Sequence, residues 1–169
     1  MNELPYTKIP EPPREMSAAT VLVRLVDAIG FRYRWATEGL REEDMNFQPC
    51  STSMKVRELL AHIQGLLSIS ESYLTDAERV EIGSLNLYER RRRTLDTVLR
   101  IRDFLLMLDD DYLAEREYKV PWATEPLPVW YLINGPLSDA LTHIGQVASW
   151  RRINNNPIMR ASVFFGTPP

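Results

Sequence analysis

Apolar residues recur every three or four positions along four long stretches of the chain, the spacing that places them on one face of an α-helix. We predict helices over residues 17–40, 54–74, 85–108 and 128–153. In the first, the apolar face is formed by Val21, Leu22, Leu25, Val26, Ile29, Tyr33, Ala36 and Leu40. Because each helix has one apolar face and no segment alternates convincingly as a strand, the pattern predicts an all-α four-helix bundle.

Prolines and polar residues separate these helices. The first residues carry Pro5, Pro10, Pro12 and Pro13 and should form an extended arm. Residues 45–53 are expected to form a loop, with Ser53 as the N-cap of the second helix. A polar stretch from Thr75 to Ser84, with Gly83 as its break, precedes the third helix. The tail, residues 160–169, has no helical period and is expected to pack across the bundle.

The ends of the third and fourth helices raise two further expectations. Asp109, Asp110 and Asp111 follow the third helix, and negative charge is unfavourable near a helix C-terminus, so that end should fray. Residues 112–128, which include Pro121, should be irregular. Pro136 removes a hydrogen bond to the carbonyl of Leu132 and predicts a kink or a restart, with Asn134 as the cap of the restarted helix.

Composition sets the broad class of the protein. A chain of 169 residues is long enough for one domain with a hydrophobic core, which we take to span residues 1–169. Its net charge of −3 provides no field that would attract nucleic acid or an anionic membrane. The sequence shows no signal peptide and no run of about 18 apolar residues that could span a membrane. Cys50 is the only cysteine, which fits a cytoplasmic protein, and we interpret it as an incidental thiol rather than a nucleophile.

The two histidines are the main candidates for chemistry. His62 lies on the second predicted helix and His143 on the fourth, each beside the apolar stripe. Asp139 stands four residues before His143, so both side chains project from one helix face about 6 Å apart. Two imidazoles and one carboxylate form a recurring catalytic metal set. We therefore consider His62, Asp139 and His143 as metal ligands, with an ordinary hydrogen bond between Asp139 and His143 and a buried, backbone-bonded His62 as the alternative.

Other kinds of site have less support. Di-iron bundles need a glutamate three residues before each histidine, whereas Leu59 and Ala140 occupy those positions. No glycine-rich phosphate loop and no nucleophile elbow occurs. The basic run from Glu89 to Arg102 could hold a phosphate backbone, but a solvated face with acidic neighbours explains it better. Two interpretations remain for Arg151: it could bind an anionic substrate, or it could be a charge at the protein surface.

Two stretches carry a resemblance to a known family. They are FQPCSTSMKVRELLAHIQ, around His62, and SDALTHIGQVASWRR, around His143. Together with the order of elements over residues 17–153, they resemble the DinB/YfiT-like superfamily of bacterial four-helix-bundle proteins. In that comparison His62 matches the first metal ligand and His143 the third. Asp139 stands where the family usually has a second histidine, and its carboxylate favours harder metals.

The resemblance implies an up-down-down-up bundle that binds a divalent metal between its helices. Zinc or nickel would be the usual ion, and iron or manganese also suits this ligand set. It further implies homodimers and a small-molecule substrate. Characterised relatives include thiol-dependent transferases and an isomerase that uses a low-molecular-weight thiol. The expected function is a metal-dependent transferase acting with such a thiol. The alternative is a non-catalytic bundle, a binding or stress-response accessory protein with a degenerate metal site.

Several neighbours of the histidines have provisional roles. Gln146 would hydrogen-bond a ligand, or be a surface amide, and Gly145 would allow two helices to approach closely, or only weaken its helix. Aromatic residues would wall a pocket or belong to the core: Trp35, Trp130 and Trp150. Glu58 would be an outer partner of His62 or a solvated charge. No catalytic residue is assigned.

Overall fold

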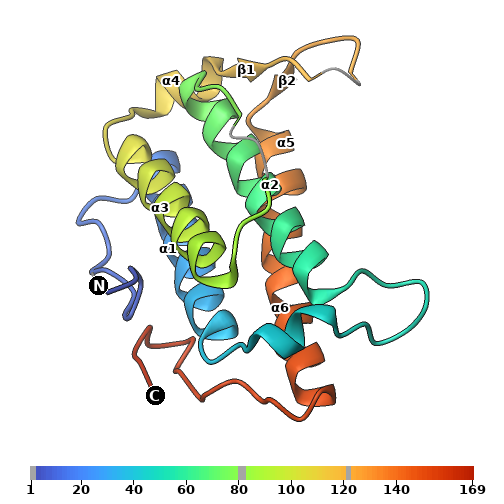
Figure 1. Cartoon of the computed structure of the whole chain (residues 1–169). Helices are drawn as coiled ribbons and strands as arrows, with labels where there is room; N and C mark the ends of the chain where they lie inside the picture. Colours follow the sequence, from blue (N-terminus) through green and yellow to red (C-terminus); the bar gives the residue numbers. More distant parts are fainter. Residues whose placement is uncertain (1–2, 80–82, 121–122) are drawn as a thin grey trace.

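Four long helices lie side by side in the computed structural model, which describes residues 3–79, 83–120 and 123–169 (Figure 1). They are α1 (Ala18–Thr37), α2 (Val56–Thr75), α3 (Leu87–Leu105) and α6 (Ser138–Ile153). The shorter elements are η1 (Glu42–Asn46), α4 (Asp110–Glu115), α5 (Trp130–Leu132), the π-helical turn η2 (Ile133–Leu137), and strands β1 (Glu117–Tyr118) and β2 (Leu127–Pro128). The predicted helical class is confirmed for this described part of the chain.

Three short segments lie outside the described residues. They are residues 1–2 of the predicted arm, residues 80–82 of the predicted polar break, and residues 121–122, which include Pro121. In the remainder of the chain, no helix is both long and apolar enough to cross a membrane.

The apolar faces meet in one core. Helix α1 contacts α3 and α6, and α2 contacts the same two helices. Val23, Val26 and Ile29 of α1 are fully buried, as are Leu59 and Ile63 of α2. Each such side chain stabilises the fold by about 1.5–3 kcal/mol relative to an exposed one. This packing positions α2 directly beside α6.

The observed helix starts correct one predicted cap. Ser17 begins α1 by accepting a hydrogen bond from the backbone of Thr20 at 3.2 Å. Ser53 does not cap α2, which starts at Val56. Its hydroxyl instead donates to the carbonyl of Cys50 at 2.9 Å, within the preceding turn.

The acidic run after α3 stabilises helix starts rather than fraying a helix end. Asp109 accepts a hydrogen bond from the backbone N–H of Tyr112 at 2.8 Å and so caps α4. Asp110 accepts from the N–H groups of Ala18 and Ala19 at 3.1 and 3.2 Å, at the start of α1. These donors lower the pKa of the Asp110 carboxyl. Negative charge is favourable at a helix N-terminus, so Asp109 and Asp110 stabilise the starts of α4 and α1. Helix α3 itself ends at Leu105, three residues before its predicted end.

One predicted irregular region contains regular structure. The loop predicted at residues 45–53 does so only at its start, where Met45 and Asn46 end the 3-10 helix η1. The region before α5 contains α4 and a small antiparallel pair in which Glu117 faces Pro128 and Tyr118 faces Leu127. Such short elements leave little periodic signal in the sequence.

The predicted interruption of the fourth helix is confirmed, although its cap differs. The backbone of Gly135 is non-helical, with ψ −106°, and Pro136 follows it within η2. Asn134 is exposed. The hydrogen bond across the break comes from Ser138, whose hydroxyl donates to the carbonyl of Ile133 at 2.6 Å. The helix then resumes as α6.

The arm and the tail lie beside each other (Figure 1). The backbone N–H of Ile9 donates to the carbonyl of Gly166 at 2.8 Å. Tyr6 anchors the arm: its side chain is 5 % exposed and its hydroxyl donates to the buried carboxylate of Asp27 at 3.1 Å. Burial raises the pKa of Asp27. The tail turns back on itself and leaves Phe164 mostly exposed, so it covers the bundle only in part.

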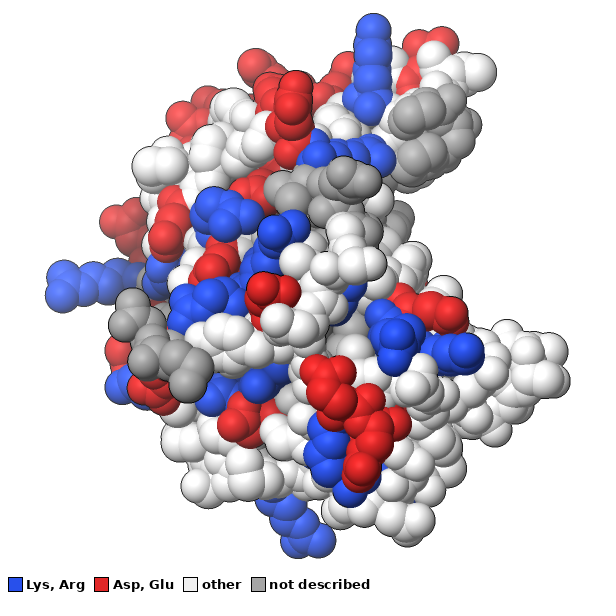
Figure 2. All heavy atoms as spheres, viewed as in Figure 1, with Lys and Arg blue, Asp and Glu red and all other residues white. Residues whose placement is uncertain are grey.

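Arginines predicted to face solvent hold helices together instead. Arg90 is 7 % exposed and donates to Gln64 Oε1 at 2.7 Å, joining α3 to α2. Arg151 is 3 % exposed and donates to the carbonyls of Ala36 and Glu38, at the C-terminal end of α1. Burial lowers the pKa of the Arg151 guanidinium. On the face shown in Figure 2, basic and acidic side chains are interspersed and form no continuous basic surface.

Candidate metal centre

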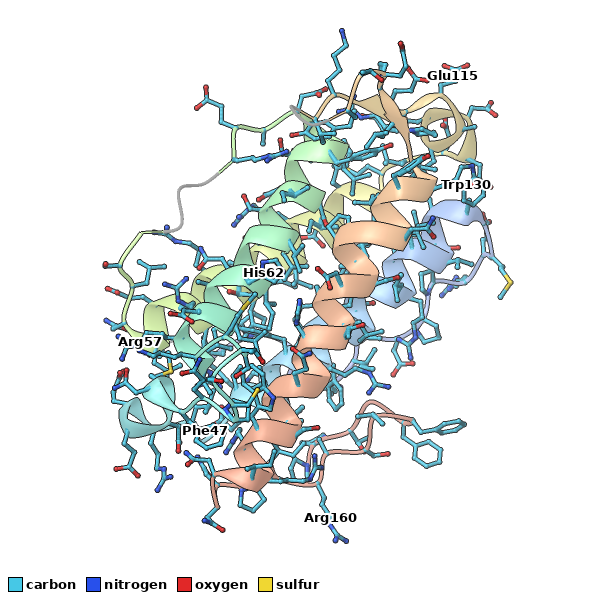
Figure 3. The ribbon with its side chains drawn as sticks, turned by 90° about the vertical axis from the view of Figure 1, so that its right-hand side faces the viewer. Phe47, Arg57, His62, Glu115, Trp130 and Arg160 are labelled. Atoms are coloured by element: carbon cyan, nitrogen blue, oxygen red, sulfur yellow. The ribbon has the colours of Figure 1, made fainter. Side chains whose placement is uncertain are left out.

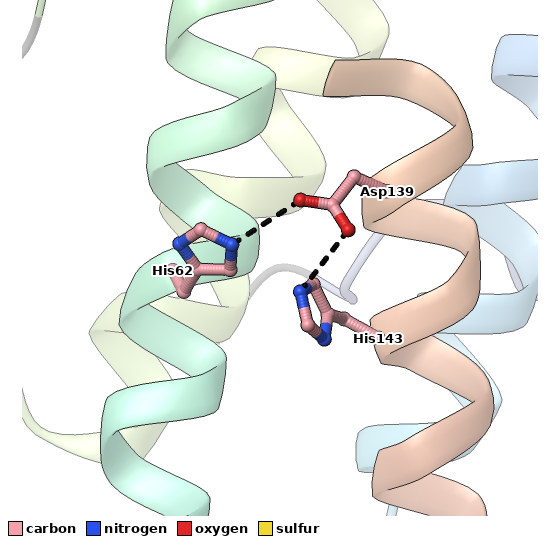
Figure 4. Close-up of side chains that lie close together, drawn as sticks. All are labelled: His62, Asp139 and His143. Carbon is pink, nitrogen blue, oxygen red and sulfur yellow. Dashed lines mark hydrogen bonds and ion pairs between the residues drawn. The ribbon is translucent and has the colours of Figure 1, made fainter. Parts of the chain in front are cut away.

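His62, Asp139 and His143 meet between α2 and α6 (Figure 4). One carboxylate oxygen, Asp139 Oδ2, lies 3.4 Å from His62 Nε2. The other oxygen, Oδ1, lies 3.2 Å from His143 Nε2. The two imidazole rings are 4.8 Å apart between centroids and nearly perpendicular, at 81°. The structure therefore brings together all three side chains that the sequence singled out.

Buried neighbours hold each histidine at the border between the core and the solvent. On α2, Leu59 and Ile63 are fully buried and fix the rotation of the helix around His62. On α6, Ala140 and Ile144 do the same for Asp139 and His143. The side chain of His143 is 16 % exposed, whereas those of His62 and Asp139 are 38 % and 44 % exposed. The core thus fixes the site, while the exposed fractions of His62 and Asp139 leave it accessible to solvent. Figure 3 shows His62 on α2, beside α6.

Gln146 orients His143. Its Oε1 lies 2.8 Å from His143 Nδ1. Because this amide oxygen only accepts hydrogen bonds, Nδ1 carries a proton, and Nε2, on the side of Asp139, is the nitrogen that can bind a metal. That is the tautomer that a metal ligand requires, and metal-bound histidines generally donate their other N–H in this way. The role proposed for Gln146 from the sequence agrees with this contact.

The separations of the donor atoms fit a shared cation. Two ligand atoms bound to zinc at about 2.0–2.1 Å with tetrahedral angles lie roughly 3.3 Å apart. The two histidine–carboxylate distances, 3.4 Å to Asp139 Oδ2 and 3.2 Å to Asp139 Oδ1, are close to that separation. One donor atom from each residue can be chosen so that all three lie within 4.8 Å of one another.

The donor set also limits what the site can do. Three protein ligands leave coordination positions free for a small molecule, as in catalytic rather than structural zinc sites. Two imidazoles with a carboxylate suit zinc, iron, nickel and manganese. Cys50 is exposed and lies beside Thr52, whose hydroxyl lowers the pKa of the thiol. That cysteine is not part of the cluster.

Other residues nominated from the sequence have different roles. Glu58 accepts a hydrogen bond from the backbone N–H of Lys55 at 2.8 Å, which caps α2. A Cβ added at Gly145 would meet no atom within 4 Å, so this glycine does not serve close helix contact. Trp130 is 68 % exposed, and Trp35 lines a pocket against α6 and the tail. The tryptophans therefore do not wall a common pocket at the site.

Sequence reasoning missed an aromatic pocket that lies further along α2, between this helix, the β1–β2 pair, α5 and η2. It is lined by Ile69 and Tyr73 of α2, by Tyr118, and by residues that include Tyr131 and Pro136. Ile69 follows His62 by seven residues, two helical turns along the same face. The seven-residue spacing of His62 and Ile69 was the only signal for this pocket in the sequence, because Tyr118 and Tyr131 come from segments without a helical period.

Comparisons of the chain with models of known families, with curated proteins and with solved structures found no match.

Proposed function

We propose that the chain is a divalent-metal-dependent enzyme that acts with a low-molecular-weight thiol on a small-molecule substrate. The observation that carries this proposal is the meeting of His62, Asp139 and His143 between two helices, with one side open to solvent. In this assignment the three residues hold one ion, and Gln146 keeps His143 in the required tautomer. Zinc or nickel is the expected ion, and iron or manganese suits the same ligands.

The chemistry that such an ion supplies is Lewis acidity, which lowers the pKa of a thiol so that it is nucleophilic at neutral pH. In the transfer itself, the thiol sulfur forms a bond to an electrophilic carbon of the second substrate. The bond between that carbon and its leaving group breaks, and the thiol proton departs with the leaving group. The partly exposed faces of His62 and Asp139 are the side from which both molecules would approach.

The resemblance to the DinB/YfiT-like superfamily supports the same proposal. The fold that this resemblance implies is an up-down-down-up four-helix bundle. It agrees with the course of the long helices in Figure 1, where α2 and α3 run in one direction and α1 and α6 in the other. The contacts of α1 and α2 with both α3 and α6 support this arrangement. Homodimer formation remains a proposal that rests on the resemblance alone.

Metal analysis tests the proposal most directly. Purified protein, loaded with Zn²⁺ and dialysed, is expected to retain one ion per chain. His62→Ala and His143→Ala should each lose it, while Thr142→Ala, an exposed neighbour on α6, should retain it. A chain that binds no ion, and is equally stable with and without chelator, would favour the non-catalytic bundle.

Activity is tested separately. Metal-loaded protein is screened for S-transfer from several low-molecular-weight thiols to an electrophilic acceptor, with the His143→Ala variant as the control. Thiol-dependent product that requires His143 is the expected result. Metal binding without any transfer would refute the enzyme assignment and leave the metal site in place.

A further inference from the structure

An aromatic pocket of about 200 Å³ lies between α2, the β1–β2 pair, α5 and η2, the turn that immediately precedes α6. Its walls include Ile69 and Tyr73 from α2, Tyr118 from β1, and Tyr131 from α5. Gly135 and Pro136 of η2 complete the side next to α6. Among the described residues, none that lines it is charged, and the guanidinium of Arg79 lies 5.7 Å from the centroid of the Tyr118 ring.

The hydroxyls of Tyr73 and Tyr118 have partners within the protein. The hydroxyl of Tyr73 donates to the carbonyl of Leu127 at 2.8 Å. The hydroxyl of Tyr118 lies 3.1 Å from Ser72 Oγ and accepts from Arg79. The rings of Tyr73 and Tyr118 lie 5.2 Å apart between centroids, so the pocket presents mainly ring surface. Its chemistry therefore favours an uncharged apolar or aryl group.

The size of the pocket agrees with one such group. Engineered apolar cavities of about 150 Å³ in other proteins bind benzene. A pocket of about 200 Å³ can accept one aryl ring or a short branched alkyl chain. A larger ring system would not fit without displacing Ile69 or Tyr131.

Helix geometry places this pocket above the metal ligands. Ile69 lies seven residues beyond His62 on the same face of α2, roughly 10 Å along the axis. Pro136 and Gly135 precede Asp139 by three and four residues, roughly 5 Å. A Cβ added at Gly135 would meet no atom within 4 Å, so no side chain closes this side of the pocket. A ligand with a short linker could thus place one group in the pocket and its other end at the three metal ligands.

We propose that the pocket binds an aryl or short alkyl group of a thiol whose sulfur lies at the His62–Asp139–His143 site. This inference rests on the proposed function and adds the class of substrate. The pocket determines which thiol is accepted, because burial of the ring strengthens binding only when the linker spans the distance to the ligands. Thiols with a charged tail are disfavoured, since no counter-charge lines the pocket.

The first experiment measures thiol binding to Co²⁺-loaded protein through the sulfur-to-cobalt absorption band. The probes are ethanethiol, benzyl mercaptan, phenethyl mercaptan and phenylbutyl mercaptan. The best phenylalkyl thiol is expected to bind at least about tenfold more tightly than ethanethiol, from burial of the ring. Ile69→Trp, which fills the pocket, should reduce that preference to about twofold, and Tyr131→Ala, at a half-exposed wall, should weaken it. Ile153→Trp, at the exposed far end of α6, should preserve it.

Equal binding of ethanethiol and the phenylalkyl thiols, or a preference that survives Ile69→Trp, would overturn the inference. If no thiol produces the absorption band, the proposed function fails, and the pocket is then judged by a second measurement that needs no metal. In that measurement butylbenzene, which has no thiol, is titrated into protein with ¹³C-labelled isoleucine methyl groups. A saturable shift of the Ile69 methyl signal, absent in Tyr131→Ala, supports the pocket, and an unshifted signal refutes it.

Discussion

Replacing Gln146 with leucine tests whether His143 is prepared as a metal ligand. The Gln146 oxygen accepts from His143 Nδ1 at 2.8 Å and fixes the proton on that nitrogen. Leucine is close in size but cannot accept a hydrogen bond, so the imidazole becomes free to rotate and to change tautomer. Loss of such an outer hydrogen bond typically weakens metal binding about 10- to 100-fold. That corresponds to about 1.4–2.7 kcal/mol of binding free energy.

Stability of the metal-free protein should change much less. Gln146 is only partly buried, and one hydrogen bond between neutral groups contributes about 0.5–1.5 kcal/mol. Zn²⁺ affinity is measured by competition with a chromophoric chelator, and unfolding of the metal-free form by urea. The matched control is Ser149→Leu, which adds the same side chain at an exposed position one turn further along α6. Unchanged Zn²⁺ affinity in Gln146→Leu would show that this contact does not prepare His143 for a metal.

Three further predictions concern the fold. Asp44→Asn should lose about 2–3 kcal/mol of stability at neutral pH, because the carboxylate is 2 % exposed and accepts from Arg41. Since Arg41 holds the pKa of Asp44 well below its usual range, the difference in Tm from wild type should start to shrink as the pH falls below about 4, and it should vanish only when the pH falls through that lowered pKa. Asp110→Asn should lower the Tm with the same pH dependence, because the pKa of Asp110 is lowered by the backbone donors of α1. Gly30→Ala should destabilise by about 1–3 kcal/mol, because the new Cβ would lie 2.7 Å from the Tyr6 ring. In a Tyr6→Ala background the same change should cost little, and additive losses in urea unfolding would refute the contact.

The sequence predicted the long helices because their period reports a buried face directly. Their exact ends depended on groups that are distant in sequence. Asp110 illustrates this, since its carboxylate caps α1 from 92 residues further along the chain. The sequence analysis considered only the preceding helix, so it treated Asp110 as a charge at the C-terminus of α3 rather than as a cap of α1. Arg151 was misjudged for the same reason, because the carbonyls it binds belong to α1.

The metal site could likewise be predicted only in part, because one of its contacts depends on local spacing and the others depend on tertiary packing. The spacing of Asp139 and His143 fixed their common face from sequence alone. Their meeting with His62 required α2 to lie beside α6, which depends on how the four apolar faces pack. The aromatic pocket was not predicted because Tyr118 and Tyr131 are brought to α2 by the irregular segments around β1 and α5.

The candidate ligands come from two helices only, and His62 and Asp139 are separated by 77 residues of chain. An ion shared by them would act as a removable cross-link that closes one long loop of the unfolded polypeptide. By analogy with a disulfide across a loop of that length, its entropic contribution would be about 4–5 kcal/mol. The ion would thus add to the apolar contacts that already hold α6 against α2. Metal binding would then raise the free energy of unfolding as well as supply a reactive centre.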